Sequence, residues 1–395
     1  MEEKHFLTPH PDIELGFERK PVEYFLTFPD KGINADTGLI FSIPGYGDRA
    51  DFEYQKVKLR PYMANKYNCI AVGLNYFGAK LYALADNETD YQIPEIFATA
   101  VSEMYGISRQ EYLINGTLQL GVLAGMLSAR GCKSPGMEFR LSVRNRNDIN
   151  EYPSFGLLPA MDHIQVLGEI LKKYKIDRKR LIAFGSSYGG YIALLLGKFA
   201  PNTFSVIIDN SGFIKSKLAD IATAELSRWA RKLNVNGIDY PIVINSPWTI
   251  LDDASPYYFS DSHRCIRNLL FNDYLDETST RYYIFHSEQD SVVPVKEKDA
   301  FCTVLKERGV EVSYKVVGSR DIDGRLFKNL DHAMNASLRG IFDSVAESNG
   351  KNLCKADPLT DFDNESLYRF NCGNWSYIFS YRKDLSVKVE LSGNA

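Results

Sequence analysis

Gly185-Ser186-Ser187-Tyr188-Gly189-Gly190 follows the apolar segment Arg180 to Phe184 and opens a helical pattern that runs from Tyr188 to Phe199. The stretch fits G-x-S-x-G, which is typical of a sharp turn between a strand and a helix. Such a turn exposes the serine at the carboxyl end of the strand, and its glycines allow a close backbone approach because they lack a Cβ atom. Ser187 is therefore the candidate nucleophile. A glycine-rich turn without a catalytic role has the same local sequence, so the surrounding chain must decide.

Short apolar runs alternate with helical patterns on both sides of this stretch, from about Leu39 to Phe342. The rhythm is typical of β-α-β units around a mostly parallel central sheet with helices on both faces, which is an α/β fold. Before it, Glu14–Phe17 and Val22–Phe28 alternate in polarity and are predicted to form an antiparallel strand pair. The later strands are predicted at Leu39–Ile43, Cys69–Tyr76, Arg180–Phe184, Phe204–Asp209, Arg281–His286 and Glu311–Val317.

Two long segments interrupt this rhythm. Residues 77–153 and 212–280 exceed the usual connections of a compact sheet, and we interpret them as inserted cap or lid segments. The catalytic domain is expected to span residues 1–346, and a β-rich C-terminal extension is expected at residues 347–395. Because insertions at the carboxyl end of a sheet lie above the nucleophile, both are expected to line the substrate pocket.

A serine hydroxyl is a weak nucleophile, so it needs a histidine base and a carboxylate that orients this base. Asp290 lies in the loop after the strand that ends at His286, and His332 follows the last strand of the sheet. They complete the chain order Ser, Asp, His that is typical of this kind of site. Asp331 is the alternative carboxylate, although side chains of adjacent residues seldom face each other. The other histidines lie in the leading segment, in a helix, in an insertion or inside a strand, so His332 is the candidate base.

Acyl transfer also needs N–H donors at the position where negative charge develops. Pro44-Gly45-Tyr46-Gly47 follows the buried strand Leu39–Ile43, so it can bring a backbone N–H beside the serine. We predict that the backbone N–H groups of Tyr46 and Tyr188 form the oxyanion hole.

The same loop also fits a dinucleotide-binding fingerprint, because Gly45 to Ala50 satisfies G-x-G-x-x-A. The next strand ends in Leu74-Asn75-Tyr76 and offers no acidic residue for a ribose hydroxyl, which argues against this interpretation. Asp361 to Ser366 begins like a calcium loop but lacks the glycine at its sixth position, and it is interpreted as a solvated turn. No cofactor and no metal are therefore expected.

The chain has 395 residues, 46 Lys+Arg, 50 Asp+Glu and a formal net charge of −4, which argues against a protein that coats nucleic acid. Met1 to His5 includes acidic residues and does not read as a secretory signal, which favours a cytoplasmic location. The six cysteines lack C-x-x-C spacing and are expected to be reduced thiols. The apolar stretch Leu113–Ala129 contains too many polar residues for a membrane span. No sequence feature specifies an oligomeric state.

These motifs resemble the α/β-hydrolase superfamily and, within it, the catalytic domains of prolyl-oligopeptidase-like serine hydrolases. Ser255-Pro256-Tyr257-Tyr258-Phe259 looks like the S-P-x-x-Y segment of that group, and His286 to Pro294 looks like H-G-x-x-D-x-x-V-P. The resemblance covers about Leu39 to Phe342 outside the insertions and implies the α/β-hydrolase fold. The departures are Ser287 in place of a glycine, Ala333 after the histidine, and the missing N-terminal propeller, which weakens the expectation of peptidase activity.

The layout of the whole chain is also similar to an uncharacterised bacterial hydrolase-like family associated with flagellar glycosylation. That resemblance implies a sugar ester or an acylated sugar as the substrate class. The basic stretch from Lys133 to Arg146, with Arg140 and Arg144, would then contact an acidic sugar; its alternative role is a solvated face.

The leading hypothesis is a serine hydrolase, esterase-like or deacylase-like, that cleaves a carboxylic ester of a small molecule or an acylated sugar through an acyl-enzyme. A serine peptidase or an acyltransferase would use the same site. A catalytically silent binding protein with this fold is the alternative of another class, because a fold does not determine a function.

Overall fold

The computed structural model of the chain describes residues 2–83, 89–114, 117–132, 141–145, 150–222, 225–226, 231–271, 278–348 and 353–393. The chain forms two compact units. Unit 1 comprises Met1–Ala83, Ser154–Ser216 and Asp261–Ala395, and unit 2 comprises Leu84–Pro153 and Lys217–Ser260. Both segments of unit 2 fall inside the two stretches interpreted as insertions, whereas the outer ends of those stretches belong to unit 1.

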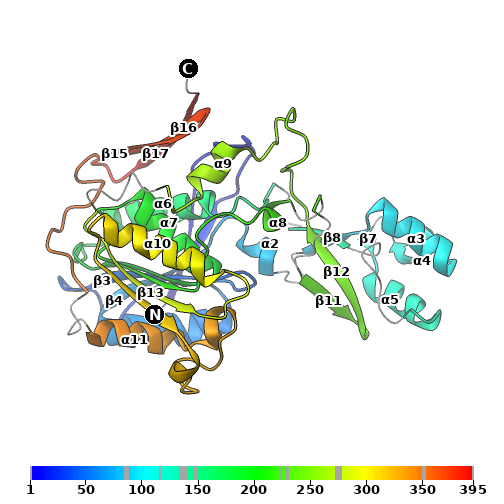
Figure 1. Cartoon of the computed structure of the whole chain (residues 1–395), viewed down its shortest axis with the longest axis horizontal. Helices are drawn as coiled ribbons and strands as arrows, with labels where there is room; N and C mark the ends of the chain where they lie inside the picture. The colour runs from blue at the N-terminus through cyan, green and yellow to red at the C-terminus, as the bar shows by residue number, and fades with distance from the viewer. Residues whose placement is uncertain are drawn as a thin grey trace. The chain divides into compact units, whose positions relative to one another are not determined.

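Unit 1 is built on an eight-stranded sheet with the strand order β1-β2-β4-β3-β9-β10-β13-β14 (Figure 1). The strands are β1 (Glu2–Leu7), β2 (Val22–Thr27), β3 (Gly38–Ile43), β4 (Cys69–Asn75), β9 (Leu181–Ser186), β10 (Val206–Asn210), β13 (Arg281–Ser287) and β14 (Val312–Val317). β2 is antiparallel to both of its neighbours, and every adjacent pair from β4 to β14 is parallel. The mostly parallel α/β sheet expected from the sequence is thereby confirmed.

Helices cover both faces of this sheet, as apolar parallel strands require. One face carries α1 (Arg60–Tyr67) and α11 (Leu338–Ser348), and the other carries α6 (Leu157–Lys173), α7 (Tyr188–Phe199) and α10 (Val295–Glu307) (Figure 1). Met63 and Phe342 share a core cluster with Tyr283. The adjacent Tyr282 instead contacts Gly197 of α7 and Phe301 of α10, because successive residues of a strand point to opposite faces. Shorter helical segments are η1 (Tyr54–Leu59), α2 (Ala79–Ala83), α9 (Asp261–Ile266), η4 (Ser319–Asp321) and η5 (His332–Asn335).

The predicted antiparallel pair at the start of the chain was half wrong. β2 pairs with β1, which comes from the first residues of the chain, and not with Glu14–Phe17. The amides of Glu14 and Leu15 donate to Asp12 Oδ1 at 3.0 and 3.1 Å, and Gly16 has a positive φ of 68°, so this segment forms a turn. The polarity pattern was misleading because Glu14 is buried in an ion pair with Arg267 and does not face solvent.

The C-terminal residues form a small antiparallel sheet of β15 (Leu367–Cys372), β16 (Trp375–Tyr381) and β17 (Val387–Gly393) that belongs to unit 1. Phe379 stacks on Phe199 of α7 with ring centroids 4.6 Å apart, and the Tyr381 hydroxyl donates to the Phe199 carbonyl at 2.8 Å. The turn that resembled a calcium loop is not fully solvated, because Asp361 is buried and accepts a hydrogen bond from Thr203 Oγ1 at 2.7 Å.

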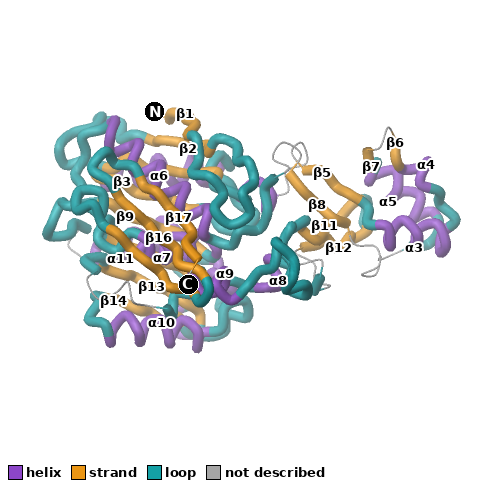
Figure 2. Tube along the Cα trace, turned by 90° about the horizontal axis from the view of Figure 1, so that it is seen from above, coloured by secondary structure: helices purple, strands orange, loops and turns teal. Residues whose placement is uncertain are grey.

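Unit 2 contains a four-stranded sheet with the order β11-β12-β8-β5, and its strands are drawn in orange in Figure 2. Its elements are β5 (Thr89–Gln92), α3 (Glu95–Tyr105), α4 (Arg109–Tyr112), β6 (Leu113–Ile114), β7 (Thr117–Leu118), α5 (Leu120–Ala129), β8 (Leu141–Asn145), α8 (Leu218–Ile221), β11 (Arg231–Val235) and β12 (Ile238–Ile244). Phe97 of α3, Leu123 of α5 and Tyr240 of β12 belong to one buried cluster, which gives unit 2 a core of its own.

Three further expectations from the sequence concern the basic stretch, a membrane-spanning helix and the cysteines. Lys133, Arg140 and Arg146 of the basic stretch lie outside the described residues, as does the side chain of Arg144. Within the described ranges, no helix combines the length and the apolar character that crossing a membrane requires. All six cysteines carry free thiols.

The ion pair between Glu14 and Arg267 generates a prediction about stability. Arg267 Nη1 donates to Glu14 Oε1 at 2.8 Å, and both side chains are fully buried. Burial acts to raise the pKa of Glu14, but the charge and the hydrogen bonds of Arg267 outweigh it and lower that pKa. Glu14→Gln should therefore lower the free energy of unfolding by about 3 kcal/mol at neutral pH, because it removes the carboxylate charge that faces the buried guanidinium.

Because the folded pKa of Glu14 is lowered, its contribution to stability is complete above the unfolded value of about 4.3 and is lost as the pH falls through the folded value. Denaturant unfolding of the wild type and of Glu14→Gln should therefore differ at neutral pH and converge as the pH falls through the lowered folded pKa of Glu14. Glu365→Gln, which removes an exposed partner of Lys383, is the control and should change stability little. Equal stability of the wild type and Glu14→Gln at neutral pH would contradict the assignment.

Candidate active site

Ser187 occupies a strained turn between β9 and α7, with φ 56° and ψ −122°. The flanking glycines make the turn possible, because a Cβ atom on Gly189 would lie 2.1 Å from the Ile43 carbonyl oxygen and one on Gly185 would lie 2.2 Å from the Gly189 backbone. The α7 backbone therefore passes against the loop after β3. This close packing holds a non-glycine residue in a conformation that costs about 1–3 kcal/mol.

The structure brings Ser187, His332 and Asp290 into one hydrogen-bonded series. Ser187 Oγ lies 2.7 Å from His332 Nε2, and His332 Nδ1 lies 2.8 Å from Asp290 Oδ2 and 3.1 Å from Oδ1. The carboxylate therefore accepts Nδ1–H, which leaves the Nε2 lone pair free to accept the serine proton. The alternative carboxylate, Asp331, is exposed, and the contact to Nδ1 is made by Asp290.

Asp290 lies in the loop after β13, in surroundings that favour its ionised form. Its side chain is fully buried, and Oδ1 accepts the amides of Val292 at 2.8 Å and Val293 at 2.9 Å. Burial acts to raise the pKa of Asp290, but the hydrogen bonds from His332 and from these amides outweigh it and lower that pKa. A carboxylate that stays charged can orient the imidazole and stabilise its protonated form.

The loop after His332 has an unusual backbone. Ala333, Met334 and Asn335 have positive φ values of 62°, 58° and 42°, which L-residues rarely adopt. Met334 is fully buried in the core cluster below the sheet, and its amide donates to the Asp331 carbonyl at 2.8 Å. Burial of the Met334 side chain therefore stabilises the left-handed turn of the residues that directly follow His332 in the chain.

The predicted oxyanion loop runs beside the nucleophile. A Cβ atom on Gly45 would lie 3.0 Å from the Ser186 carbonyl oxygen and 3.6 Å from Ser187 Cβ. The rings of Tyr46 and Tyr188 stack with centroids 4.0 Å apart and an interplanar angle of 11°. The loop that carries Tyr46 thus lies beside Ser187, and the role of the Tyr46 and Tyr188 N–H groups stays a prediction.

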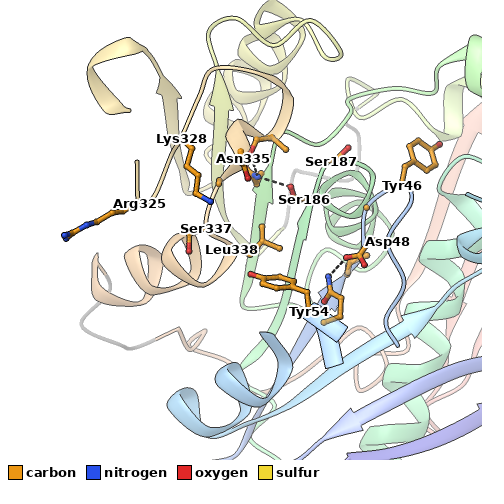
Figure 3. A pocket seen from close by; sticks show the side chains of 16 residues that line it. Tyr46, Asp48, Tyr54, Ser186, Ser187, Arg325, Lys328, Asn335, Ser337 and Leu338 are labelled. Carbon is orange, nitrogen blue, oxygen red and sulfur yellow. Dashed lines mark hydrogen bonds between the residues drawn. The ribbon is translucent and has the colours of Figure 1, made fainter. Parts of the chain in front are cut away.

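A cavity of about 570 Å³ adjoins Ser187, and polar and apolar residues both line it (Figure 3). Gln55 Nε2 donates to Asp48 Oδ2 at 2.8 Å on one side of this cavity, and burial raises the pKa of Asp48. Figure 3 shows Lys328 extending toward Ser337 and Arg325 extending away from the cavity. The other lining residues are Ile43, Gly45, Tyr46, Tyr54, Ser186, Asn210, Ala333, Asn335, Ala336 and Leu338.

Sequence reasoning missed Asp48, Asn210 and Lys328 as residues of this site. Asn210 carried a usable signal, because it is a polar residue at the carboxyl end of the buried strand that follows the nucleophile strand. Asp48 and Lys328 lie in loops whose course depends on tertiary packing. In the part of the chain that the structure describes, no group of three or more His, Cys, Asp or Glu side chains is placed to hold a metal ion.

Residues 3–391 match the family described as "Protein of unknown function (DUF2920)", and the chain belongs to this family. No curated protein matches the sequence.

Solved structures with a similar fold include the Pyrococcus horikoshii acylaminoacyl peptidase, with 16% identity and a TM-score of 0.46 over 90% of this chain and 42% of that one. A puromycin-hydrolyzing peptidase of Mycobacterium tuberculosis shows 13% identity and a TM-score of 0.46 over 89% of this chain and 40% of that one. An arylesterase shows 13% identity and a TM-score of 0.43 over 89% of this chain and 83% of that one. The chain therefore spans less than half the length of the two peptidases.

The hydrogen-bonded series generates a prediction for variants. Ser187→Ala and His332→Ala should each lower kcat by roughly a million-fold, and Asp290→Asn by about ten-thousand-fold, because the three groups act as a unit. Turnover of an ester substrate, measured per folded molecule, checks this result.

Asp331→Asn is the control and should keep the activity of the wild type. A mild loss in Asp290→Asn together with a severe loss in Asp331→Asn would move the orienting carboxylate to Asp331. Similar activity in all of the first three variants and the wild type would rule out the whole assignment.

Proposed function

We propose that this DUF2920 protein is a serine hydrolase that cleaves a carboxylic ester through an acyl-enzyme. The observation that carries the proposal is the series from Ser187 Oγ to His332 Nε2 at 2.7 Å and from His332 Nδ1 to Asp290 Oδ2 at 2.8 Å. A serine at the carboxyl end of a parallel strand, with a histidine and a buried carboxylate in this order, is the arrangement that activates a hydroxyl for acyl transfer.

In the first half of the reaction, Ser187 Oγ attacks the ester carbonyl while His332 Nε2 takes the hydroxyl proton. Asp290 stabilises the imidazolium that forms. The negative charge that develops on the carbonyl oxygen is stabilised by the N–H groups of Tyr46 and Tyr188. The tetrahedral intermediate collapses, and the alcohol leaves with the proton that His332 returns.

In the second half, His332 takes a proton from water, which attacks the acyl-enzyme. The second tetrahedral intermediate then collapses, the acid leaves, and His332 returns the proton to Ser187 Oγ. An acyltransferase would differ only in that a bound alcohol replaces this water. A peptidase would release an amine in the first half. No separate observation favours either alternative, and ester hydrolysis needs no second substrate besides water.

An acylated sugar fits the cavity beside Ser187 as the substrate class. The cavity holds carboxylate, amide, hydroxyl and ammonium groups, including Asp48, Asn335 and Lys328, which can exchange hydrogen bonds with several hydroxyl groups. Its volume of about 570 Å³ is in the range that accommodates a small ligand. The cytoplasmic location and the cap role of the insertions stay predictions.

A fluorophosphonate probe tests the proposed chemistry, because only an activated serine reacts with it. The wild type should be labelled at Ser187, as identified by peptide mass spectrometry, and Ser187→Ala should not be labelled. A panel of acylated sugars and simple esters should then release free acid. A protein that binds these esters without labelling or turnover would be a silent binding protein instead.

Rising concentrations of sugar alcohols separate hydrolysis from transfer. A hydrolase should keep releasing free acid as a steady share of turnover. Diversion of most acyl groups to the added alcohol would make the protein an acyltransferase.

Lys328 should select for negative charge in the substrate, because it lines the cavity and has no ion-pair partner among the described residues. Lys328→Ala should raise KM about five-fold for esters whose alcohol carries a carboxylate or phosphate, and it should leave neutral esters unaffected. Lys306→Ala on the exposed side of α10 removes the same charge away from the cavity and is the matched control. An equal rise in KM for charged and neutral esters would exclude this role.

A further inference from the structure

Asn210 lies where the two halves of the proposed site meet. It is the last residue of β10, it is 1% exposed, and its register partners are Ser186 of β9 and Phe285 of β13. It is therefore one strand away from the residue that precedes the nucleophile.

Three hydrogen bonds connect Asn210 to both of the segments that must meet. Its backbone carbonyl accepts the amide of Ser187 at 2.8 Å, and its Nδ2 donates to Ser186 Oγ at 2.9 Å. The same Nδ2 donates to the Ala333 carbonyl at 3.3 Å, directly after His332. One residue thus contacts the serine turn and the histidine loop at the same time.

The orientation of the amide is determined by these contacts. The Ala333 carbonyl can only accept a hydrogen bond, so the Asn210 atom beside it must be the donor nitrogen. Asn210 Oδ1 is then buried and has no hydrogen-bond partner in the described part of the chain. A buried acceptor without a partner costs free energy, and the two hydrogen bonds that Asn210 Nδ2 donates must offset this cost.

The two turns that Asn210 contacts both contain residues in backbone conformations that L-residues rarely adopt. The Ala333 carbonyl belongs to the first of three successive residues with positive φ, and Ser187 on the other side also has a positive φ of 56°. The nucleophile and the base come from segments 145 residues apart. Small shifts of either turn would lengthen the contact of 2.7 Å between Ser187 Oγ and His332 Nε2, on which proton transfer depends.

We infer that Asn210 is a positioning residue that holds the Ser187 turn and the His332 loop at reaction distance. The inference rests on the proposed function and adds a residue that touches neither the proton nor the reacting carbonyl in the mechanism above. Its effect is on the geometry of the base relative to the nucleophile.

Asn210→Ala and Asn210→Asp test this role, because the first removes the amide and the second keeps its shape but replaces the donor nitrogen with an acceptor. For both, kcat on an ester and the rate of fluorophosphonate labelling at Ser187 should fall about 10- to 100-fold, with KM within about two-fold of the wild type. Using both variants keeps the test decisive if one of them folds poorly.

Ser205→Ala is the matched control. Ser205 is fully buried beside the other end of β10, and its hydroxyl donates to the Leu181 carbonyl at 3.0 Å. This variant should lower the melting temperature in the same way as a lost buried hydrogen bond in Asn210→Ala, but it should keep kcat and the labelling rate. The double variant Ser186→Ala/Asn210→Ala should lose less kcat than the two single variants added together, because both substitutions remove the same hydrogen bond between Asn210 Nδ2 and Ser186 Oγ.

Asn210 variants that are less stable but keep the kcat and labelling rate of the wild type would show a purely structural role and overturn the inference. A rise in KM with unchanged kcat would instead make Asn210 a substrate contact, which also overturns it. Absence of labelling at Ser187 in the wild type would refute the proposed function itself and with it this role, so the two failures are distinguishable.

Discussion

The hydrogen-bonded register of β9, β10 and β13 is the constraint on which the rest of the site depends. It sets Asn210 opposite Ser186 on one side and opposite Phe285 on the other. Because parallel strands end at the same edge, the serine turn and the loop that carries Asp290 start from one row of backbone hydrogen bonds. A shift of one residue would turn each side chain to the opposite face of the sheet and separate these groups.

Strain and buried charge are concentrated at this edge, and the packing around it stabilises them. The turn at Ser187 is closed by the contact of Gly189 with the loop after β3, and the turn after His332 is anchored by the buried side chain of Met334. Beneath the edge, Lys298 donates to Asp209 Oδ2 and to the Gly212 carbonyl inside the protein. These additional hydrogen bonds offset the desolvation of the buried charges, which an isolated ion pair would not achieve.

Local sequence patterns predicted the strands of the sheet well where the strands are buried, because burial requires apolar residues. The inner strands β3, β4, β9, β10 and β13 are buried apolar runs because helices cover both of their faces. Each of the later strands expected from the sequence is present, including the partly exposed edge strand β14. The same kind of reasoning failed at Glu14, because it assumed that a carboxylate faces water. Arg267, whose partner Glu14 lies far away in the chain, makes burial of this carboxylate possible, and no local pattern contains that information.

The sequence by itself predicted the α/β fold, the turn at Ser187 and the order of a serine, a carboxylate and a histidine, because these follow from short-range rules on apolar periods, glycines and strand ends. It favoured Asp290 over Asp331 as the carboxylate, it marked Asn210 only as a polar residue at a strand end, and it did not indicate Lys328. Only the tertiary structure decided which carboxylate reaches His332 Nδ1, at 2.8 Å, and which side chain joins the serine turn to the histidine loop. The physical reason is that hydrogen bonds act over about 3 Å between segments that chain topology brings together from distant positions, and their partners leave no periodic trace in the sequence.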